Sequence, residues 1–547
     1  MHVRQPEPTM NHREMSRSSE SAVGRHADVM KLAKSCASRF LLIRPYWPGL
    51  ERSIYWLMTV GVVVYPWIKL YEVSSAYDWR RQPTYFVVNR LWGFGERPKD
   101  TTDLEWSQWC YFASQLFPYY FIHAVLFNVA SKLLPQRIWS LTMLFYWVTA
   151  CCIVFHPSSV IVVVSVGAVM YTVTALTRSI ALVWIMSCCF LYLVMDMLPE
   201  LPINKGISHY GVIAFFTYKI VQFTSYCLDS IESKSSKRFF EGIYEMFWYS
   251  FYYPYLVYLI VPFKHFAEGM NRRKAEQQNL YRVAFFALRV LFWYTLINVG
   301  LYFFYFSAIV NNTDYLDQLP RDALCSIGCC IGQFFHMKYV VIFGLQALFA
   351  KLDKLEPPAG PICISRVTLY SKLWRYFDRG LYSFFKEYIF VPICRPSFSV
   401  PRRLLAMLLC FGFVILWHGS DHNYIVWVSL NIAEILLENT SRAIYNIPAV
   451  KSWRERHISD GCFRRILALL CVIPYTFGLY SNFYFLSTSE AGYIFVNKFF
   501  WSDTIHLRYP FLILVFFGYC FANVTIELDS HLEQKKTIIK TDYFHVH

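Results

Sequence analysis

Charged residues are scarce in this chain. Only 16% of its 547 residues are Asp, Glu, Lys or Arg, whereas 56% are hydrophobic and 19% are aromatic. A soluble protein carries about a quarter of its residues as charges, because every domain needs a polar shell. Long apolar runs recur along almost the whole sequence, so an ordinary soluble protein is excluded and an all-α, polytopic integral membrane protein is predicted.

Acidic residues are the rarer of the two signs, with 37 Asp and Glu against 52 Lys and Arg, which gives a formal net charge of +15. In a soluble chain this excess would suggest nucleic acid as a partner. In a membrane protein, excess Lys and Arg instead marks cytosolic loops. No basic and aromatic recognition motif lies outside the apolar runs, so we expect a lipid bilayer and no nucleic acid.

The chain also lacks the cysteine spacing of a zinc site or a disulfide framework. Its 16 cysteines are scattered as neighbours inside apolar runs and are expected to be small buried hydrophobes. Residues 1–40 lack the apolar core of a signal peptide and predict a disordered cytosolic arm. The expected organisation is this arm, a single membrane domain over 41–530, and a polar C-terminal tail over 531–547.

Apolar runs of about twenty residues predict the membrane spans. Farther along the chain, four shorter or less regular runs raise the expected total to about 10–12 transmembrane helices. The first eight spans are expected at 54–70, 117–134, 138–155, 160–176, 180–198, 210–228, 285–310 and 324–348, and the later four at 404–417, 424–437, 466–486 and 511–526.

Loop charge predicts the orientation of these spans. Residues 351–403 hold ten Lys or Arg and four acids, which is typical of a cytosolic loop. The loop 311–322 is acidic and contains the glycosylation sequence Asn311-Asn312-Thr313, which fits a lumenal face. The run 244–261 has basic residues on both sides and Pro254 in its middle, so we expect a re-entrant segment surrounded by protein.

Two ionisable residues stand out as candidate sites. His418 ends the apolar run 404–417, and a neutral imidazole there can act as a base near neutral pH. Asp378 lies between Arg375 and Arg379 in a segment rich in aromatics. Taken locally, an interfacial histidine and an interfacial ion pair are the more common explanations of such residues.

The order of several short motifs resembles the membrane-bound O-acyltransferase superfamily, and in particular its Hedgehog acyltransferase branch. The similarity concentrates in residues 355–500, which would be the catalytic half. The motifs are Pro357-Pro358 with Cys363, the stretch Trp374 to Gly380, Val391-Pro392, Trp417-His418-Gly419, Leu437-Glu438-Asn439, Ser481-Asn482 and, more weakly, Tyr252-Tyr253-Pro254.

This resemblance implies a multi-pass enzyme of the endoplasmic reticulum or Golgi membrane. Such an enzyme would transfer a palmitoyl group from cytosolic palmitoyl-CoA to the N-terminal cysteine of a secreted Hedgehog-type protein. His418 and Asp378 match the catalytic positions of that branch. The residues expected to bind substrate are Trp374, Arg375, Arg379, Asn482 and Trp417.

The resemblance also bears on Cys363, which is similar to a family cysteine associated with haem b. A thiolate is a sound ligand for haem iron, although S-palmitoylation near a cytosolic membrane surface is the rival interpretation. Two other functions remain as alternatives at this point. One is a polytopic transporter of the glycerol-uptake kind, and the other is a catalytically silent relative that binds lipid or a partner.

Overall fold

The structure, a computed structural model, describes residues 49–196, 209–233, 238–273, 275, 277–501 and 508–545. The predicted arm 1–40 lies outside this range. The chain forms two compact units. The smaller unit comprises residues 1–59, 445–472 and 517–547, and the larger comprises 60–444 and 473–516.

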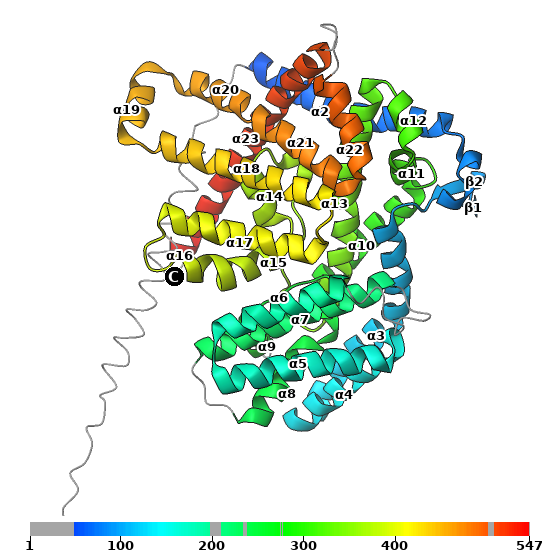
Figure 1. Cartoon of the computed structure of the whole chain (residues 1–547), viewed down its shortest axis with the longest axis vertical. Helices are drawn as coiled ribbons and strands as arrows, with labels where there is room; N and C mark the ends of the chain where they lie inside the picture. The colour runs from blue at the N-terminus through cyan, green and yellow to red at the C-terminus, as the bar shows by residue number, and fades with distance from the viewer. Residues whose placement is uncertain are drawn as a thin grey trace, which may run out of the picture. The chain divides into compact units, whose positions relative to one another are not determined.

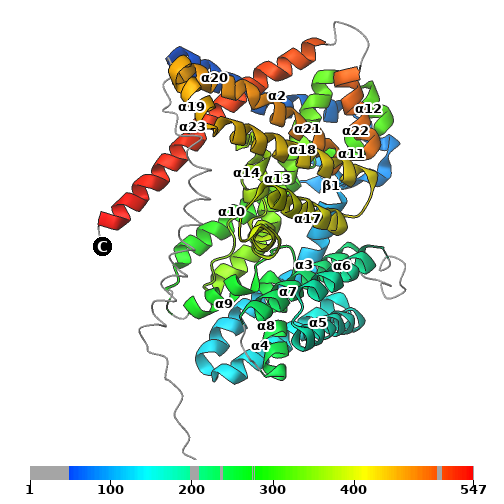
Figure 2. The ribbon, with the colours of Figure 1, turned by 60° about the vertical axis from the view of Figure 1, so that its left-hand side comes forward.

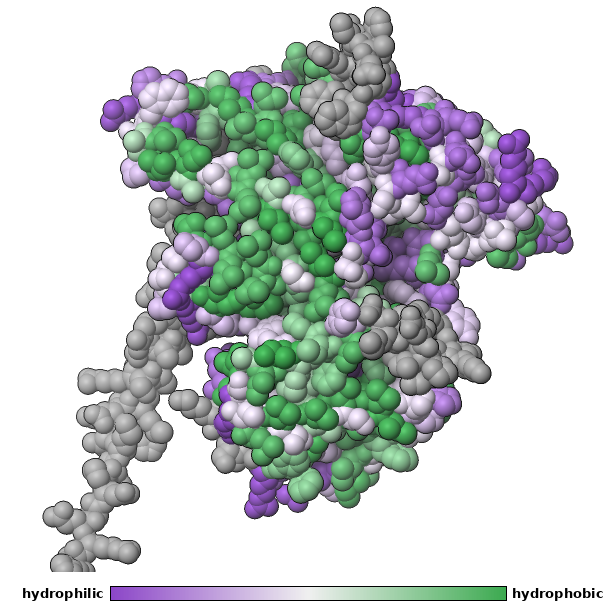
Figure 3. All heavy atoms as spheres, viewed as in Figure 1, coloured by the Kyte–Doolittle hydropathy of each residue, from purple (hydrophilic) through white to green (hydrophobic). Residues whose placement is uncertain are grey.

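The first half of the larger unit is a bundle of apolar helices. Helices α4, α5, α6 and α7 pack in pairs, and Figures 1 and 2 both show α5, α6 and α7 side by side. Large apolar side chains such as Phe145, Ile161 and Leu176 stay exposed on the bundle, whose outer face is strongly hydrophobic in Figure 3. The bounds are α3 (Leu104–Leu133), α4 (Gln136–Phe155), α5 (Pro157–Thr177), α6 (Ile180–Asp196) and α7 (His209–Glu232).

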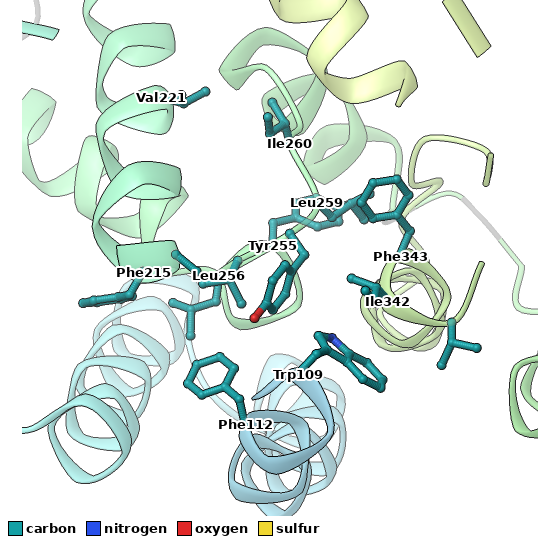
Figure 4. Packing of buried hydrophobic residues seen from close by; sticks show 14 of the residues in the cluster. Trp109, Phe112, Phe215, Val221, Tyr255, Leu256, Leu259, Ile260, Ile342 and Phe343 are labelled. Carbon is teal, nitrogen blue, oxygen red and sulfur yellow. The ribbon is translucent and has the colours of Figure 1, made fainter. Parts of the chain in front are cut away.

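A buried, largely non-helical segment follows this bundle. Helix α8 (Phe239–Ser250) stops before the 3₁₀ turn η5 (Tyr253–Tyr255), and the chain becomes helical again at α9 (Phe263–Arg272). Residues 251–262 are all buried, and Figure 4 shows several of them between α3, α7 and α13. The break predicted around Pro254, with protein on all sides, is therefore confirmed. That both flanks face the cytosol stays a prediction.

One predicted span is wrong in its extent. The run 285–310 is not a single helix, because α10 (Leu280–Gly300) ends at Gly300 and α11 begins only at Phe306. The hairpin of β1 (Phe86–Leu91) and β2 (Gly95–Asp100) fills the break. The buried Asp100 donates its backbone N–H to the Leu301 carbonyl at 3.0 Å and accepts the N–H groups of Ser307 and Ala308.

The long helix α13 (Arg321–Leu352) packs against α10 and connects two predicted loops. The second of these, 351–403, is largely helical and not an open loop. The remaining elements of the larger unit are α11 (Phe306–Asn311), α12 (Thr313–Gln318), η6 (Ile364–Arg366), α14 (Tyr370–Tyr376), α15 (Arg379–Phe385), η7 (Lys386–Phe390), α16 (Val391–Cys394), α17 (Val400–His418), α18 (His422–Tyr445), α21 (Val472–Leu486), α22 (Ser489–Val496) and η8 (Asn497–Trp501), with the short turns η1 (Trp79–Arg81) and η2 (Pro83–Tyr85) before the hairpin.

The smaller unit joins the start of α2 (Gly49–Ala76) to α19 (Pro448–His457), α20 (Asp460–Leu470) and the later part of α23 (Arg508–His545). Arg465 forms an ion pair with Glu51 at 2.6 Å, and Arg52 forms one with Glu527 at 2.8 Å. Helix α23 continues to His545, so the predicted tail 531–547 is helical over most of its length.

Seven helices in the described part of the chain are long and apolar enough to cross a membrane, which confirms an all-α polytopic protein. Helices α3, α7 and α18 are also long but less apolar, and α6 is short. The total of 10–12 spans stays a prediction. The seven are Gly49–Ala76, Gln136–Phe155, Pro157–Thr177, Leu280–Gly300, Arg321–Leu352, Val400–His418 and Asp460–Leu486.

Candidate active site

The larger unit contains a cavity of about 400 Å³ between α13, α14, α15, α17, α18 and α21. This volume falls within the range of about 300–1,000 Å³ that is usual for small-molecule sites. Most of its wall is aromatic or aliphatic, and a few polar side chains interrupt it. The apolar wall includes Phe335, Tyr339, Phe343, Ile364, Phe377, Leu381, Phe385, Phe390, Met407, Phe411, Val414, Trp427, Ile435, Phe485 and Leu486.

His418 lies on this wall at the last position of α17. The helix begins with Pro401 in its first turn, where a missing N–H costs nothing. It ends because Gly419 has a φ of 98°, a backbone conformation that favours glycine. The His418 ring meets Trp427 and Phe485 edge-on, at centroid distances of 5.5 Å each.

Asp378 lines the same cavity from the junction of α14 and α15. It is the N-cap of α15, and its Oδ1 accepts the N–H of Leu381 at 2.9 Å. Burial raises the pKa of the Asp378 carboxyl to about 6, although backbone N–H bonds from Leu381 and Gly380 act in the opposite direction. The carboxyl is therefore poised to titrate close to neutral pH.

Trp374 forms part of the wall next to the histidine. Its indole N–H donates to the side-chain oxygen of Asn431 at 2.8 Å, and Asn431 is almost fully buried on α18. The Trp374 ring also packs against Trp427 at 5.8 Å and Phe411 at 5.0 Å. Trp427 thus contacts both Trp374 and His418, which fixes the two rings within one aromatic cluster.

Asn482 reaches the cavity from α21. Its side-chain oxygen accepts from the Tyr370 hydroxyl at 3.3 Å, and the same hydroxyl is bonded to Ser481 and to the carbonyl of Gly478. Tyr370 is buried on α14 and is itself part of the cavity wall, where it connects α14 to α21.

Three basic side chains line the cavity, namely Arg375, Lys386 and Arg442. Arg442 was missed by the sequence analysis. It donates to the Ser371 hydroxyl at 3.3 Å and lies 3.6 Å from Glu438, one helical turn away. The motif Leu437-Glu438-Asn439 was the available signal, because Asn439 lines the cavity and Arg442 follows it on the same side of α18.

The structure brings together five of the predicted site residues and separates three. His418, Asp378, Trp374, Arg375 and Asn482 all line the cavity. Arg379 and Trp417 are not among the lining residues. Arg379 stacks on Tyr376 at 5.1 Å, and Trp417 packs edge-on against Tyr218. Successive residues of a helix point in different directions, so these two neighbours of Asp378 and His418 lie outside the cavity lining.

Cys363 is also outside the cavity lining, although its neighbour Ile364 is part of it. It is partly buried before the turn η6. Within the described residues, no group of three or more His, Cys, Asp or Glu could hold a metal ion. The described residues around Cys363 therefore give no support to a haem site.

Chemically, the cavity combines a base, an acid, an apolar lining and cations at one site. An imidazole can take a proton from a nucleophile, and an apolar lining can hold a long hydrocarbon chain. Guanidinium and ammonium groups bind phosphates. This combination fits transfer of a fatty acyl group from a phosphate-bearing carrier.

Residues 126–483 match MBOAT, the membrane-bound O-acyltransferase family. The match includes every predicted site residue and covers more than half of the chain. The chain therefore belongs to the membrane-bound O-acyltransferase family, as its motifs predicted, and it is an acyltransferase.

Matches to individual relatives are longer than this region. The protein-cysteine N-palmitoyltransferase HHAT of Mus musculus is 27% identical over 497 residues, covering 88% of this chain and 98% of that protein. Rasp of Drosophila melanogaster, also named protein-cysteine N-palmitoyltransferase, is 26% identical, with coverage of 86% and 93%. The HHAT-like protein of Mus musculus is 23% identical over 399 residues, with coverage of 70% and 76%.

Proposed function

We propose that this protein transfers a palmitoyl group from palmitoyl-CoA to the N-terminal cysteine of a secreted, Hedgehog-type protein. The observation that carries the proposal is the shared cavity of His418, Asp378 and Trp374 within an otherwise apolar wall. The names of the two relatives that cover most of the chain support the choice of acceptor.

In the proposed mechanism, the acceptor thiol or amine attacks the thioester carbonyl, and His418 takes its proton. The carbon–sulfur bond then breaks, and the coenzyme A thiolate receives a proton from the imidazolium. General base catalysis of this kind contributes about 10²- to 10⁴-fold in rate. Asp378 orients His418 or the thioester, with Asn482 in a supporting role. Trp374 bounds the acyl chain next to the reacting carbon.

The cations that line the cavity explain how the acyl donor, palmitoyl-CoA, would be bound. Arg375, Arg442 and Lys386 would hold the phosphates of coenzyme A, whose charge prevents it from crossing lipid. This requires residues 351–403 to face the cytosol, where acyl-CoA is made. The acceptor would enter from the lumen of the endoplasmic reticulum or Golgi. One active site is then reached from both sides of the membrane.

The proposal includes haem b at Cys363 as the resemblance implies it. It depends on one partly buried cysteine and on the resemblance, and no catalytic step is assigned to it. S-palmitoylation of the same thiol is the competing use of this residue.

The test is an acylation assay on the purified full chain with labelled palmitoyl-CoA and short peptides that begin with Cys, Ser or Gly. We expect label on the Cys peptide alone. Label on the Ser or Gly peptide would assign a different acceptor. No label on any peptide, together with retained binding of acyl-CoA, would identify the silent relative and reject the proposal. The family match removes support from the transporter alternative.

A further inference from the structure

A row of polar side chains lies along one face of α7, away from the cavity. The polar ladder consists of Lys219, Gln222, Ser225 and Asp229, which recur at three- and four-residue spacing on the helix. Polar groups inside a membrane bundle are costly, so each one calls for a function. The ladder touches none of the substrate-binding residues assigned above.

The ladder provides hydrogen-bond partners for the backbone of the buried segment 251–262, which has few hydrogen bonds of its own. Lys219 Nζ donates to the carbonyls of Ser250 and Leu256 and to the Gln222 side-chain oxygen. All three of its donors are therefore used, and Lys219 is completely buried. Gln222 in turn donates to the carbonyl of Tyr255 at 2.6 Å.

The C-terminal half of the ladder binds the backbone of the residues that directly follow the segment. Ser225 Oγ accepts the N–H of Phe263 at 2.8 Å, and Asp229 Oδ2 accepts the N–H of Lys264 at 3.0 Å. The Tyr388 hydroxyl, from η7, lies 2.9 Å from both oxygens. The segment is thus fixed at both ends by α7, and Tyr388 connects it to the catalytic half.

The segment in turn contacts the helix that carries Asp378. A Cβ on Gly380 would lie 2.0 Å from the carbonyl oxygen of Ile260, whereas ordinary contacts begin at 3.4 Å. The backbone of α15 therefore rests directly on the backbone at Ile260. In Figure 4, Ile260 faces Val221 of α7, and Leu259 lies beside Phe343 of α13. Phe343 itself lines the cavity.

We propose that the polar ladder and the segment 251–262 form a positioning device for Asp378, which acts through the contact between Ile260 and Gly380. Gly380 follows Asp378 by two residues, and Asp378 caps the same helix. Any displacement of the segment moves the start of α15 and with it the carboxyl. The inference rests on the proposed function, because it assigns a role to the ladder in that reaction.

The decisive variant is Gly380→Ala, with Gly412→Ala as its matched control. A Cβ on Gly412, in α17, meets no atom within 4 Å. For Gly380→Ala we expect kcat to fall on the order of 10²-fold, because a misplacement of about 1 Å has this effect on catalytic groups. The KM for palmitoyl-CoA should stay unchanged, since the apolar wall is intact. Gly412→Ala should keep both constants.

A second measurement does not depend on activity. The N–H of Leu381 is bonded to Asp378, so its hydrogen exchange reports whether the cap is in place. Exchange at Leu381 should accelerate in Gly380→Ala and not in Gly412→Ala. If the unsubstituted chain acylates no peptide, the proposed function fails, and this exchange experiment still tests the positioning device.

Gln222→Met provides the same test where Gly380→Ala does not fold, because it removes the donor to Tyr255 and one acceptor of Lys219 and leaves the sequence of α15 unchanged. We expect a smaller fall in kcat with the same unchanged KM. Two outcomes would overturn the inference. One is a kcat within about threefold of normal, with normal exchange at Leu381, in folded Gly380→Ala. The other is a loss of acyl-CoA binding in step with kcat in Gln222→Met.

Discussion

The indole N–H of Trp374 donates to the side-chain oxygen of Asn431 at 2.8 Å. Trp374 packs on Trp427, and Trp427 contacts the edge of His418. One buried hydrogen bond therefore sets the ring positions of a chain of three aromatic side chains. This hydrogen bond connects α14 with α18 at the part of the cavity wall where we place the thioester.

The first prediction follows from this bond. Trp374→Phe keeps an aromatic ring but leaves the buried oxygen of Asn431 without its donor, which costs about 1–3 kcal/mol. We expect a lower unfolding temperature in detergent and a lower kcat/KM. Trp453→Phe, an indole that is 57% exposed on α19, serves as control and should change neither. A Trp374→Phe protein of normal stability would contradict the role of the bond.

The second prediction concerns the base. His418→Ala should lower acylation by about 10²- to 10⁴-fold, because proton transfer from the acceptor is lost. The protein should remain monodisperse and still bind palmitoyl-CoA, since the imidazole contributes little to holding an apolar chain. His457→Ala, on α19 in the smaller unit, is the matched control and should be fully active. Near-normal turnover in folded His418→Ala would show that His418 is not the base.

The third prediction is a pH dependence. The pKa of Asp378 is raised to about 6 by burial, so the carboxyl is charged above this pH and neutral below it. If the charged form orients the reactants, kcat should fall as the pH drops through about 6. Asp378→Asn keeps the size of the side chain and its capacity to form hydrogen bonds. We expect the activity of this variant to be severely reduced and its pH profile to lack the fall near pH 6.

A separate titration of the acceptor provides the internal check. An α-amino group has a pKa of about 7.7–8.0, so activity should also rise as the amine becomes neutral. That second step should persist in Asp378→Asn. A pH profile that is identical in both proteins would remove Asp378 from the reaction.

The fourth prediction is topological. Asn311, at the end of α11, should accept a glycan, because residues 311–322 are expected to face the lumen. A tag within 351–403 should become accessible after selective permeabilisation of the plasma membrane. Helix α13 joins the two regions, so they must lie on opposite sides if it crosses the membrane once. Protection of the tag would reverse the assigned orientation.

The fifth prediction tests the cofactor. If haem b is bound, the purified protein should show haem absorption that Cys363→Ala removes. Cys462→Ala, an exposed cysteine in the smaller unit, should leave the spectrum unchanged. An identical spectrum in Cys363→Ala, or no haem absorption at all, would reject the assignment.

The sequence predicted the all-α polytopic fold, because long apolar runs indicate helices that can cross a membrane. It failed where side chains from distant segments decide the outcome. The run 285–310 is apolar throughout, yet Asp100, some 200 residues earlier, caps the break between α10 and α11. The β-hairpin that carries Asp100 has no strong apolar alternation and was not predicted.

The same reasoning applies to the site. His418, Asp378, Trp374 and Asn482 could be chosen from motifs, because single residue types in a fixed order carry that signal. Arg442 was not chosen, because its relation to the motif Leu437-Glu438-Asn439 depends on the helical geometry of α18, which turns it toward the cavity. Arg379 was chosen as a cation of the basic loop and Trp417 as part of the motif Trp417-His418-Gly419, and a helix turns adjacent side chains by about 100°.

The partnership of Lys219 with the segment 251–262 also has a consequence for biosynthesis. The carbonyls that it binds belong to residues 31 and 37 positions later in the chain. At about 5–20 residues per second, translation needs roughly two to eight seconds to produce them. During that interval α7 carries an amino group without its final partners, so full burial of Lys219 becomes favourable only when the segment 251–262 has arrived.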